Sequence, residues 1–242
     1  MGTITMVASG KDGSGKSAFS ALLAEEYALS GKSALVIELC HGMRSLDIFM
    51  GVFGKTVYDI FDVLNGRCEP AKAIVESPIC KDLYVMPAPY NESTLVSGQF
   101  VKLCMVLSEN VDHVIIDTGC SDDTLLAAAC AAMRAIVVTT ADPSGIRDAR
   151  VCADRLFDMN VPKIRLLINR LNASLVENGI IPDLDFCIDN VGAQLVGVIP
   201  ETDEIALSLA KGEALGKSSK SHIIFQNIIS RLEGDDVPLY IQ

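Results

Sequence analysis

Short, continuously apolar runs recur along the chain, and each is followed by turn-forming residues and then by a helical spacing of apolar positions. Seven runs are of this kind: TITMVA (3–8), SALVIE (33–38), LYVMP (83–87), HVIID (113–117), AIVVTT (135–140), IRLLIN (164–169) and LVGVIP (195–200). Continuous rather than alternating hydrophobicity is typical of strands that are covered on both faces. The pattern therefore predicts an α/β fold, a three-layer sandwich in which helices flank a mostly parallel sheet.

The first two runs are joined by a glycine-rich loop and a helical segment. Residues 16–32, KSAFSALLAEEYALSGK, place Phe19, Leu22 and Tyr27 near helical spacing, and Gly31 is typical of a helix end. The predicted unit is strand, glycine-rich loop, helix, strand.

Nothing in the sequence divides the chain. It has 242 residues, half of them hydrophobic, with no internal repeat and no linker rich in Pro, Gly or Ser. This length and composition predict one domain over residues 1–242. The least regular region is residues 175–192, in which ENGIIPDLD (177–185) is predicted to be a loop, and the acidic end EGDDVPLYIQ is predicted to be a short tail.

The charge and the apolar runs disfavour two classes of partner. A net charge of −11 argues against a broad basic face for nucleic acid. The longest apolar run, LLAAACAAM (125–133), is well short of the ~20 residues of a membrane-spanning helix.

The first residues, MGTITMVASG, lack the pattern of a secretory signal. A cytoplasmic location is expected.

A phosphate-binding motif lies in the first loop. Gly10, Gly15, Lys16 and Ser17 fit the pattern G-x-x-x-x-G-K-[ST] between a strand and a helix. Glycines let backbone N–H groups turn toward phosphate oxygens, and the helix N-terminus favours negative charge. We expect Lys16 to contact the β- and γ-phosphates of ATP or ADP and Ser17 to hold Mg²⁺. The predicted cofactor-binding residues of this loop are Gly10, Lys11, Asp12, Gly13, Ser14, Gly15, Lys16, Ser17 and Ala18.

Two polar residues follow later strands. Asp117 ends the run 113–117, and open α/β sheets bind ligands at the carboxyl ends of their strands. Asn169 ends the run 164–169, and an amide offers both a donor and an acceptor for the edge of a base. Both are candidate site residues.

Lys11 adds a second lysine near the start of the loop. The resulting GKxGxGKS resembles the deviant Walker A motif of the MinD/ParA family of P-loop ATPases. Further segments occur in the order of that family, and they are most similar to its MinD branch: VIELCHGMRSLDIFMG, VYDIFDVLNG, IIDTG, TTADPSGIRDA, INR and VGVIPE. The resemblance covers nearly the whole chain and implies a P-loop NTPase fold of the MinD/ParA type.

The resemblance also implies roles for individual residues. Lys11 would reach across a dimer to the partner's nucleotide, Asp117 would bind Mg²⁺ through water, and Gly119 would face the γ-phosphate. Asp148 would lie near the dimer face. The implied base pocket comprises Asn169, Arg170, Pro200 and Glu201. The implied catalytic residues are Lys11, Lys16, Glu38 and Asp117, and the implied metal ligands are Ser17 and Asp117.

The activity implied by the resemblance is an ATP-dependent switch. ATP and Mg²⁺ would favour a homodimer with ATP sandwiched between the subunits, which recruits a MinC/MinE-like or other protein partner for spatial regulation, foremost division-site selection. One alternative is a positioning or assembly factor for flagella, pili or secretion machinery. A DNA-partition ATPase is disfavoured by the acidic charge, and an iron–sulfur carrier that uses Cys120 or Cys130 is disfavoured by the absence of C-x-x-C.

The sequence departs from the family in the first switch. The MinD branch has two aspartates separated by one residue, where this chain has Glu38 and Cys40. A thiol with a pKa of ~8.5 is mostly protonated and a weak acceptor, so it is poorly suited to position the hydrolytic water. Glu38 keeps a carboxylate that can contact Mg²⁺ or its water. Whether Glu38 takes over the work of the missing aspartate stays open. Two activities stay open with it: an ATPase whose hydrolysis resets the switch, and a nucleotide binder that turns over slowly.

Two further departures concern the loop and the end of the chain. Asp12 replaces a glycine of the family, so we expect it to crowd a position of positive φ and to weaken the ATP-sandwiched dimer by its charge, unless Lys11 offsets that charge. The last ten residues contain no Lys or Arg, unlike the basic amphipathic helix that ends MinD-type chains. No membrane binding is therefore expected of this chain as written.

Overall fold

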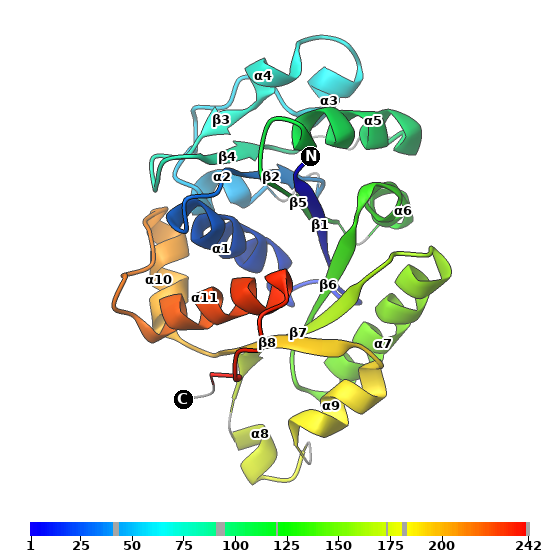
Figure 1. Cartoon of the computed structure of the whole chain (residues 1–242), viewed down its shortest axis with the longest axis vertical. Coiled ribbons are helices and arrows are strands. Elements are labelled where there is room, and N and C mark those ends of the chain that lie inside the picture. The colour runs from blue at the N-terminus through cyan, green and yellow to red at the C-terminus, as the bar shows by residue number, and fades with distance from the viewer. Residues whose placement is uncertain (41–43, 91–94, 120, 173, 181–182, 241–242) are drawn as a thin grey trace.

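The computed structural model describes residues 1–40, 44–90, 95–119, 121–172, 174–180 and 183–240 (Figure 1). Its strands are β1 (Thr3–Ala8), β2 (Ala34–Glu38), β3 (Val75–Glu76), β4 (Leu83–Met86), β5 (His113–Asp117), β6 (Arg134–Thr139), β7 (Ile164–Leu171) and β8 (Gln194–Pro200). Its helices are α1 (Lys16–Leu29), α2 (Leu46–Phe49), α3 (Ile60–Leu64), α4 (Pro70–Ala73), α5 (Ser97–Ser108), α6 (Asp122–Ala131), α7 (Pro143–Asp158), α8 (Ser174–Glu177), α9 (Leu184–Val191), α10 (Asp203–Lys211) and α11 (Lys220–Glu233).

All seven apolar runs form strands of one sheet, in the order β3-β4-β2-β5-β1-β6-β7-β8. The seven pair in parallel, which confirms the α/β prediction, and among the described strands only β3 is antiparallel to its neighbour β4. β3 was not predicted because its two residues are too short to give a hydrophobic pattern.

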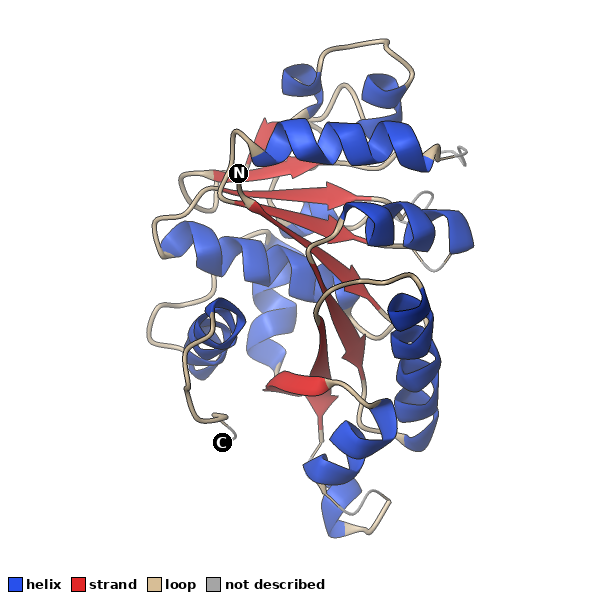
Figure 2. Ribbon diagram, turned by 45° about the vertical axis from the view of Figure 1, so that its right-hand side comes forward, coloured by secondary structure: helices blue, strands red, loops and turns tan. Residues whose placement is uncertain are grey.

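Helices cover both faces of this sheet, as Figure 2 shows. Along β1, Ile4 and Met6 pack into one apolar cluster while Val7 packs into the other. The first cluster is completed by residues of α3, α4, α5, α6, α7 and α9, and the second by residues of α1, α2, α10 and α11. Because each strand is buried on both sides, its sequence reads as a continuous apolar run.

The loop predicted over residues 177–185 is confirmed in part: residues 178–180 and 183 lie between α8 and α9, but Glu177 ends α8 and residues 184–185 begin α9, a helix that was not predicted. Asp183 caps α9 by accepting a hydrogen bond from the Phe186 N–H, and Gly192 ends it with a left-handed φ of 73°. Cys187 and Val191 are buried against the sheet. The helix is set by its caps and by two buried positions, a pattern too short for periodicity to reveal.

The acidic end of the chain lies on the fold as far as it is described. Nη1 of Arg231 donates to the Val237 carbonyl at 2.6 Å, and Nη2 donates to the Leu195 carbonyl of β8 at 3.0 Å. Leu239 and Tyr240 pack against the two apolar clusters. Among the described residues, no helix is both long and apolar enough to cross a bilayer.

The strand order places the candidate residues at one edge. β1 lies between β5 and β6, and the chain leaves β1 toward β2 on one side and enters β6 on the other. Such a reversal opens a crevice at the carboxyl ends of the strands, where α/β sheets bind ligands. The loop after β1 and the ends of β2, β5, β6, β7 and β8 all meet there (Figure 1).

Candidate nucleotide-binding site

The loop between β1 and α1 has a backbone suited to anions. Gly13 and Gly15 have φ values of 74° and 96°, which glycine adopts without steric cost. Gly15 is the N-cap of α1, and no side chain caps this helix. The N–H groups of its first turn lie at the end of the helix dipole that attracts negative charge.

Two of the loop glycines are required by close neighbours. A Cβ atom at Gly10 would lie 1.9 Å from the Asp148 carbonyl oxygen of α7. A Cβ atom at Gly15 would lie 2.2 Å from Nδ2 of Asn169. The loop is thus pressed between α7 and β7, which explains the glycines without reference to a ligand.

Lys16 is buried at the start of α1, with its ammonium inside the loop. Its Nζ donates to Ser9 Oγ at 3.0 Å and lies 3.8 Å from the carboxylate of Asp12. The Asp12 side chain is 71% exposed. The expectation that Asp12 needs a positive φ is wrong, since its φ is not among the positive values found in the described residues.

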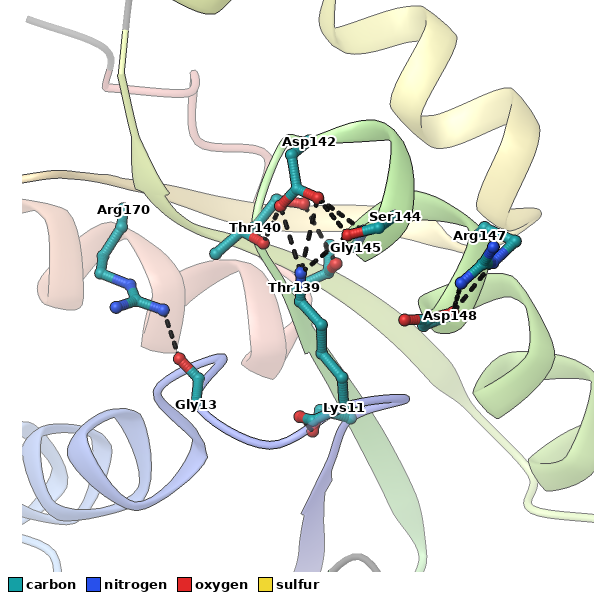
Figure 3. Close-up of polar contacts among 11 residues, drawn as sticks. Lys11, Gly13, Thr139, Thr140, Asp142, Ser144, Gly145, Arg147, Asp148 and Arg170 are labelled. Atoms are coloured by element: carbon teal, nitrogen blue, oxygen red, sulfur yellow. Dashed lines mark hydrogen bonds and ion pairs between the residues drawn. The ribbon is translucent and has the colours of Figure 1, made fainter.

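Lys11 extends away from the loop toward the start of α7 (Figure 3). Its Nζ lies 3.3 Å from Asp142 Oδ2 and 3.2 Å from Ser144 Oγ. Burial acts to raise the pKa of Asp142, but hydrogen bonds from Ser144, Thr140, the Gly145 N–H and Lys11 outweigh it and hold that pKa well below its usual range. Asp142 is therefore a firm anionic partner for Lys11 within one chain.

Asp117 is fully buried at the end of β5 and contacts α1. Ser17 Oγ donates to Oδ2 at 2.6 Å, and Ser20 Oγ donates to Oδ1 at 3.1 Å. Burial raises the pKa of Asp117 to about 6, against the lowering effects of Ser17, Lys16 and Ser20. A hydroxyl and a carboxylate side by side are oxygen donors of the kind that Mg²⁺ prefers, so these residues fit the predicted metal.

Glu38 is buried at the end of β2, beside Asp117 in the register of the sheet. Its Oε1 accepts from the N–H groups of Ser45 at 3.0 Å and Leu46 at 3.2 Å, and its Oε2 accepts from the Ala88 N–H at 3.2 Å. Burial raises the pKa of Glu38 to about 7, although the three hydrogen bonds act to lower it, and the charge of Asp117 also acts to raise it. Both oxygens thus anchor backbone, and the catalytic role of Glu38 stays a prediction.

Cys40 is half-buried next to the same carboxylates. Burial raises the pKa of its thiol, and the charges of Asp117 and Glu38 raise it further. The thiol therefore stays protonated at neutral pH. Gly119 lies close by: a Cβ atom there would be 3.7 Å from Cys40 Cα and 3.2 Å from Thr124 Oγ1.

A cavity of about 290 Å³ opens beside the loop, at the ends of β7 and β8. Its lining includes six predicted residues: Gly15, Ala18, Asn169, Arg170, Pro200 and Glu201. It also includes residues that were not predicted: Phe19, Leu22, Ile199, Thr202, Asp203, Ile205, Ala206, Leu209 and Phe225. A mostly apolar cavity with a few polar groups suits a nucleotide base.

Among the site residues that were not predicted, Asp142, the partner of Lys11, had a signal in the sequence. Asp142 precedes Pro143, and an acidic residue before Pro is typical of a helix start. Phe225 had none, because α11 lies 200 residues from the loop, and its ring stacks on Phe19 at 5.9 Å only in the fold. Asp148, predicted near a dimer face, accepts two hydrogen bonds from Arg147 (Figure 3).

Two cysteines were named for a disfavoured iron–sulfur site. Cys130 is exposed on α6, and Cys120 lies outside the described residues. Within those residues, no group of three or more His, Cys, Asp or Glu side chains could hold a metal ion. The metal ligands predicted for Mg²⁺ are Ser17 and Asp117, which are in contact.

Comparison with known proteins gives a consistent match. The model of the CobQ/CobB/MinD/ParA nucleotide binding domain matches residues 5–215. The septum site-determining protein MinD of Bacillus subtilis is 33% identical over 252 residues, which cover 100% of this chain and 92% of that protein. MinD of Synechocystis sp. is 34% identical over 244 residues, covering 98% and 92%. In the MinC:MinD cell division protein complex of Aquifex aeolicus, one chain superposes with a TM-score of 0.90 at 27% identity, covering 99% of both chains.

Proposed function

This chain belongs to the CobQ/CobB/MinD/ParA family of nucleotide-binding proteins, and from that membership we propose that it is a MinD-like switch that forms a homodimer around ATP. The proposed task is spatial regulation of cell division through selection of the division site, and a partner of the MinC kind is recruited by the ATP-bound dimer. The septum site-determining relatives and the MinC:MinD complex support this proposal. In it, residues 1–242 are one nucleotide-binding unit that acts in the cytoplasm.

The proposed site assigns phosphates to the loop and the base to the cavity. Lys16 and the first-turn N–H groups of α1 hold the β- and γ-phosphates, and Ser17 with Asp117 holds Mg²⁺. The metal, when bound, neutralises charge on the transferring phosphate. The buried Ser14 Oγ, which has no hydrogen-bond partner, supports a site built to be completed by a ligand.

The observation that carries the dimer proposal is the position of Lys11. Its ammonium lies at the rim of the site on Asp142 and Ser144, where one third of the side chain is exposed, while Lys16 occupies the interior of the loop. Two lysines at different depths of one loop support two tasks. Lys16 binds the phosphates of its own subunit, and Lys11 binds those of the partner.

We propose slow hydrolysis for this member. Cys40 is protonated where the family places a carboxylate, and Glu38 uses both oxygens on backbone N–H groups. Neither is placed to accept a proton from a water at neutral pH.

One experiment tests the switch directly. The molar mass of the protein is measured by light scattering with ATP, with ADP and without nucleotide, and phosphate release is measured in the same samples. We expect a doubled mass with ATP alone and slow release. Lys11→Ala should bind ATP without doubling, and Lys16→Ala should lose both properties. An equal mass in all three states contradicts the switch, and rapid Mg²⁺-dependent release contradicts slow turnover.

A further inference from the structure

Asn169 and Arg170 contact the phosphate loop as well as the base cavity. Nδ2 of Asn169 donates to the Ser14 carbonyl at 2.8 Å. Figure 3 shows the second bond, in which Nη2 of Arg170 donates to the Gly13 carbonyl. Two consecutive side chains of β7 thus hold two consecutive carbonyls of the loop. These bonds join positions about 155 residues apart in the sequence.

The backbone of β7 is distorted where these side chains leave it. Ile168 pairs with Val198 and Leu171 with Pro200, so three steps along β7 match two steps along β8. One extra residue therefore bulges from β7, and bulges near functional sites re-aim side chains. Arg170 has a φ of 51°, which is strained for a residue other than glycine. The strained backbone is therefore that of the residue whose side chain contacts the loop.

The bonds to the carbonyls fix the N–H groups that follow them. A peptide unit is planar and trans, so the carbonyl of one residue and the N–H of the next point in opposite directions. Holding the Gly13 and Ser14 carbonyls on β7 therefore turns the N–H groups of Ser14 and Gly15 away from it. A carbonyl that swung inward would present negative charge to a phosphate instead.

We propose that Asn169 and Arg170 are positioning residues for phosphate binding: they clasp the loop carbonyls and hold the loop ready for polyphosphate before a base is bound. The inference rests on the proposed nucleotide site and deepens it. The loop packs tightly against Asn169, because a Cβ atom at Gly15 would lie only 2.2 Å from its Nδ2. The clasp also connects the base cavity to the phosphate loop, since both residues line that cavity.

The test compares ATP with inorganic tripolyphosphate, which has the phosphates but no base. Affinities are measured by calorimetry for the wild type and for Arg170→Ala. A clasp predicts that both ligands bind about tenfold more weakly to the variant, because the hydrogen bond orients the groups that bind phosphate in each case. A residue that only contacts the base would weaken ATP and leave tripolyphosphate unchanged, and this result overturns the inference.

Three further variants separate positioning from stability. Arg170→Gly relieves the strained φ and should show the same tenfold loss without a lower melting temperature. Arg170→Lys keeps one donor and should recover part of the affinity. Arg165→Ala removes an arginine at the other end of β7 and serves as the matched control, with affinity unchanged. Loss of affinity only in variants with a lower melting temperature overturns the inference.

The wild type itself distinguishes the two proposals. A chain that binds ATP but not tripolyphosphate contradicts the clasp, because a loop held ready would bind phosphates alone, and it leaves the nucleotide switch standing. A chain that binds neither ligand contradicts the proposed function and the clasp together.

Discussion

Lys11 and Asp142 form an ion pair of 3.3 Å between the start of the phosphate loop and the start of α7, with about one third of each side chain exposed. In this pair Lys11 contacts a residue of its own subunit, whereas in the proposed switch Lys11 contacts the nucleotide of the partner subunit. In the proposed switch, dimer formation therefore breaks this ion pair. A partly exposed surface pair of this kind contributes only about 0–1 kcal/mol, which makes it a contact that a second subunit can replace.

Asp142→Asn should for this reason favour the ATP-dependent dimer. Asparagine still caps α7, where Asp142 accepts from the Gly145 N–H at 3.0 Å, so the fold is retained. We expect the ATP concentration at half-dimerisation to fall by up to about fivefold, the equivalent of about 1 kcal/mol. Analytical ultracentrifugation over an ATP titration measures it, with Ser144→Ala as a milder comparison. A weaker dimer would show that Asp142 itself contacts the partner.

Asp12→Gly should also strengthen ATP-dependent association. Asp12 carries a negative charge 3.8 Å from Lys16, close to where the triphosphate is proposed to bind. Because its backbone is not left-handed, the expected gain comes from charge and not from relief of strain. Asp12→Asn should then give most of the same gain in light scattering, and added salt should diminish it. Dimerisation unchanged in both variants would contradict a role for this charge.

Gly10→Ala should destabilise the protein more than Gly13→Ala. A Cβ atom at Gly10 would lie 1.9 Å from the Asp148 carbonyl, so α7 or the loop must move, at a cost of about 1–3 kcal/mol or more. A Cβ atom at Gly13 meets nothing within 4 Å, so only the left-handed φ opposes it, at about 1–2 kcal/mol. Urea unfolding measures both changes. The reverse order of stability would show that the loop is not pressed against α7.

Glu25→Gln should alter the pH dependence of stability. Glu25 is buried on α1 and accepts the Leu215 N–H at 2.8 Å; burial raises its pKa from 4.5 to about 7, with the Leu215 bond opposing the rise. The folded state thus binds this proton more tightly than the unfolded state. Its stabilising effect is present below about pH 4.5 and is lost as the pH rises through about 7.

The variant keeps an acceptor for Leu215 without the charge. It should therefore match the wild type near pH 4.5 and exceed it by about 1–3 kcal/mol at pH 8. Part of that gain comes from the neighbouring Glu26, whose pKa is raised to about 7 by burial and by the charge of Glu25. Urea unfolding between pH 4 and 8 provides the comparison. A difference that does not vary with pH would contradict a buried, titrating Glu25.

The sequence predicted the sheet because burial on both faces leaves a local signature, the continuous apolar run. It predicted the loop because Gly10, Gly15, Lys16 and Ser17 are close in the chain. The contacts of Lys11 with Asp142 and of Arg170 with Gly13 join residues more than 130 positions apart, and only the order of the strands brings them together. Local patterns carry no information on such pairs. The α9 helix was missed for a different reason: it is defined by its caps at Asp183 and Gly192, and its apolar pattern is too short to predict a helix.

Cys40→Asp should raise the rate of phosphate release. Cys40 is half-buried beside Asp117 and Glu38, and its protonated thiol is a weak acceptor. A carboxylate there gives the site a group that can accept a proton from water, a contribution of about 10²–10⁴ in rate when fully realised. Crowding by two neighbouring carboxylates raises the pKa of the new one and reduces the gain, so we expect about tenfold. Steady-state phosphate release with Mg²⁺ measures it. Serine is similar in size to cysteine but has no carboxylate, so Cys40→Ser should show no gain. An equal rise in both variants would mean that the thiol obstructs the site, and not that the site lacks a base.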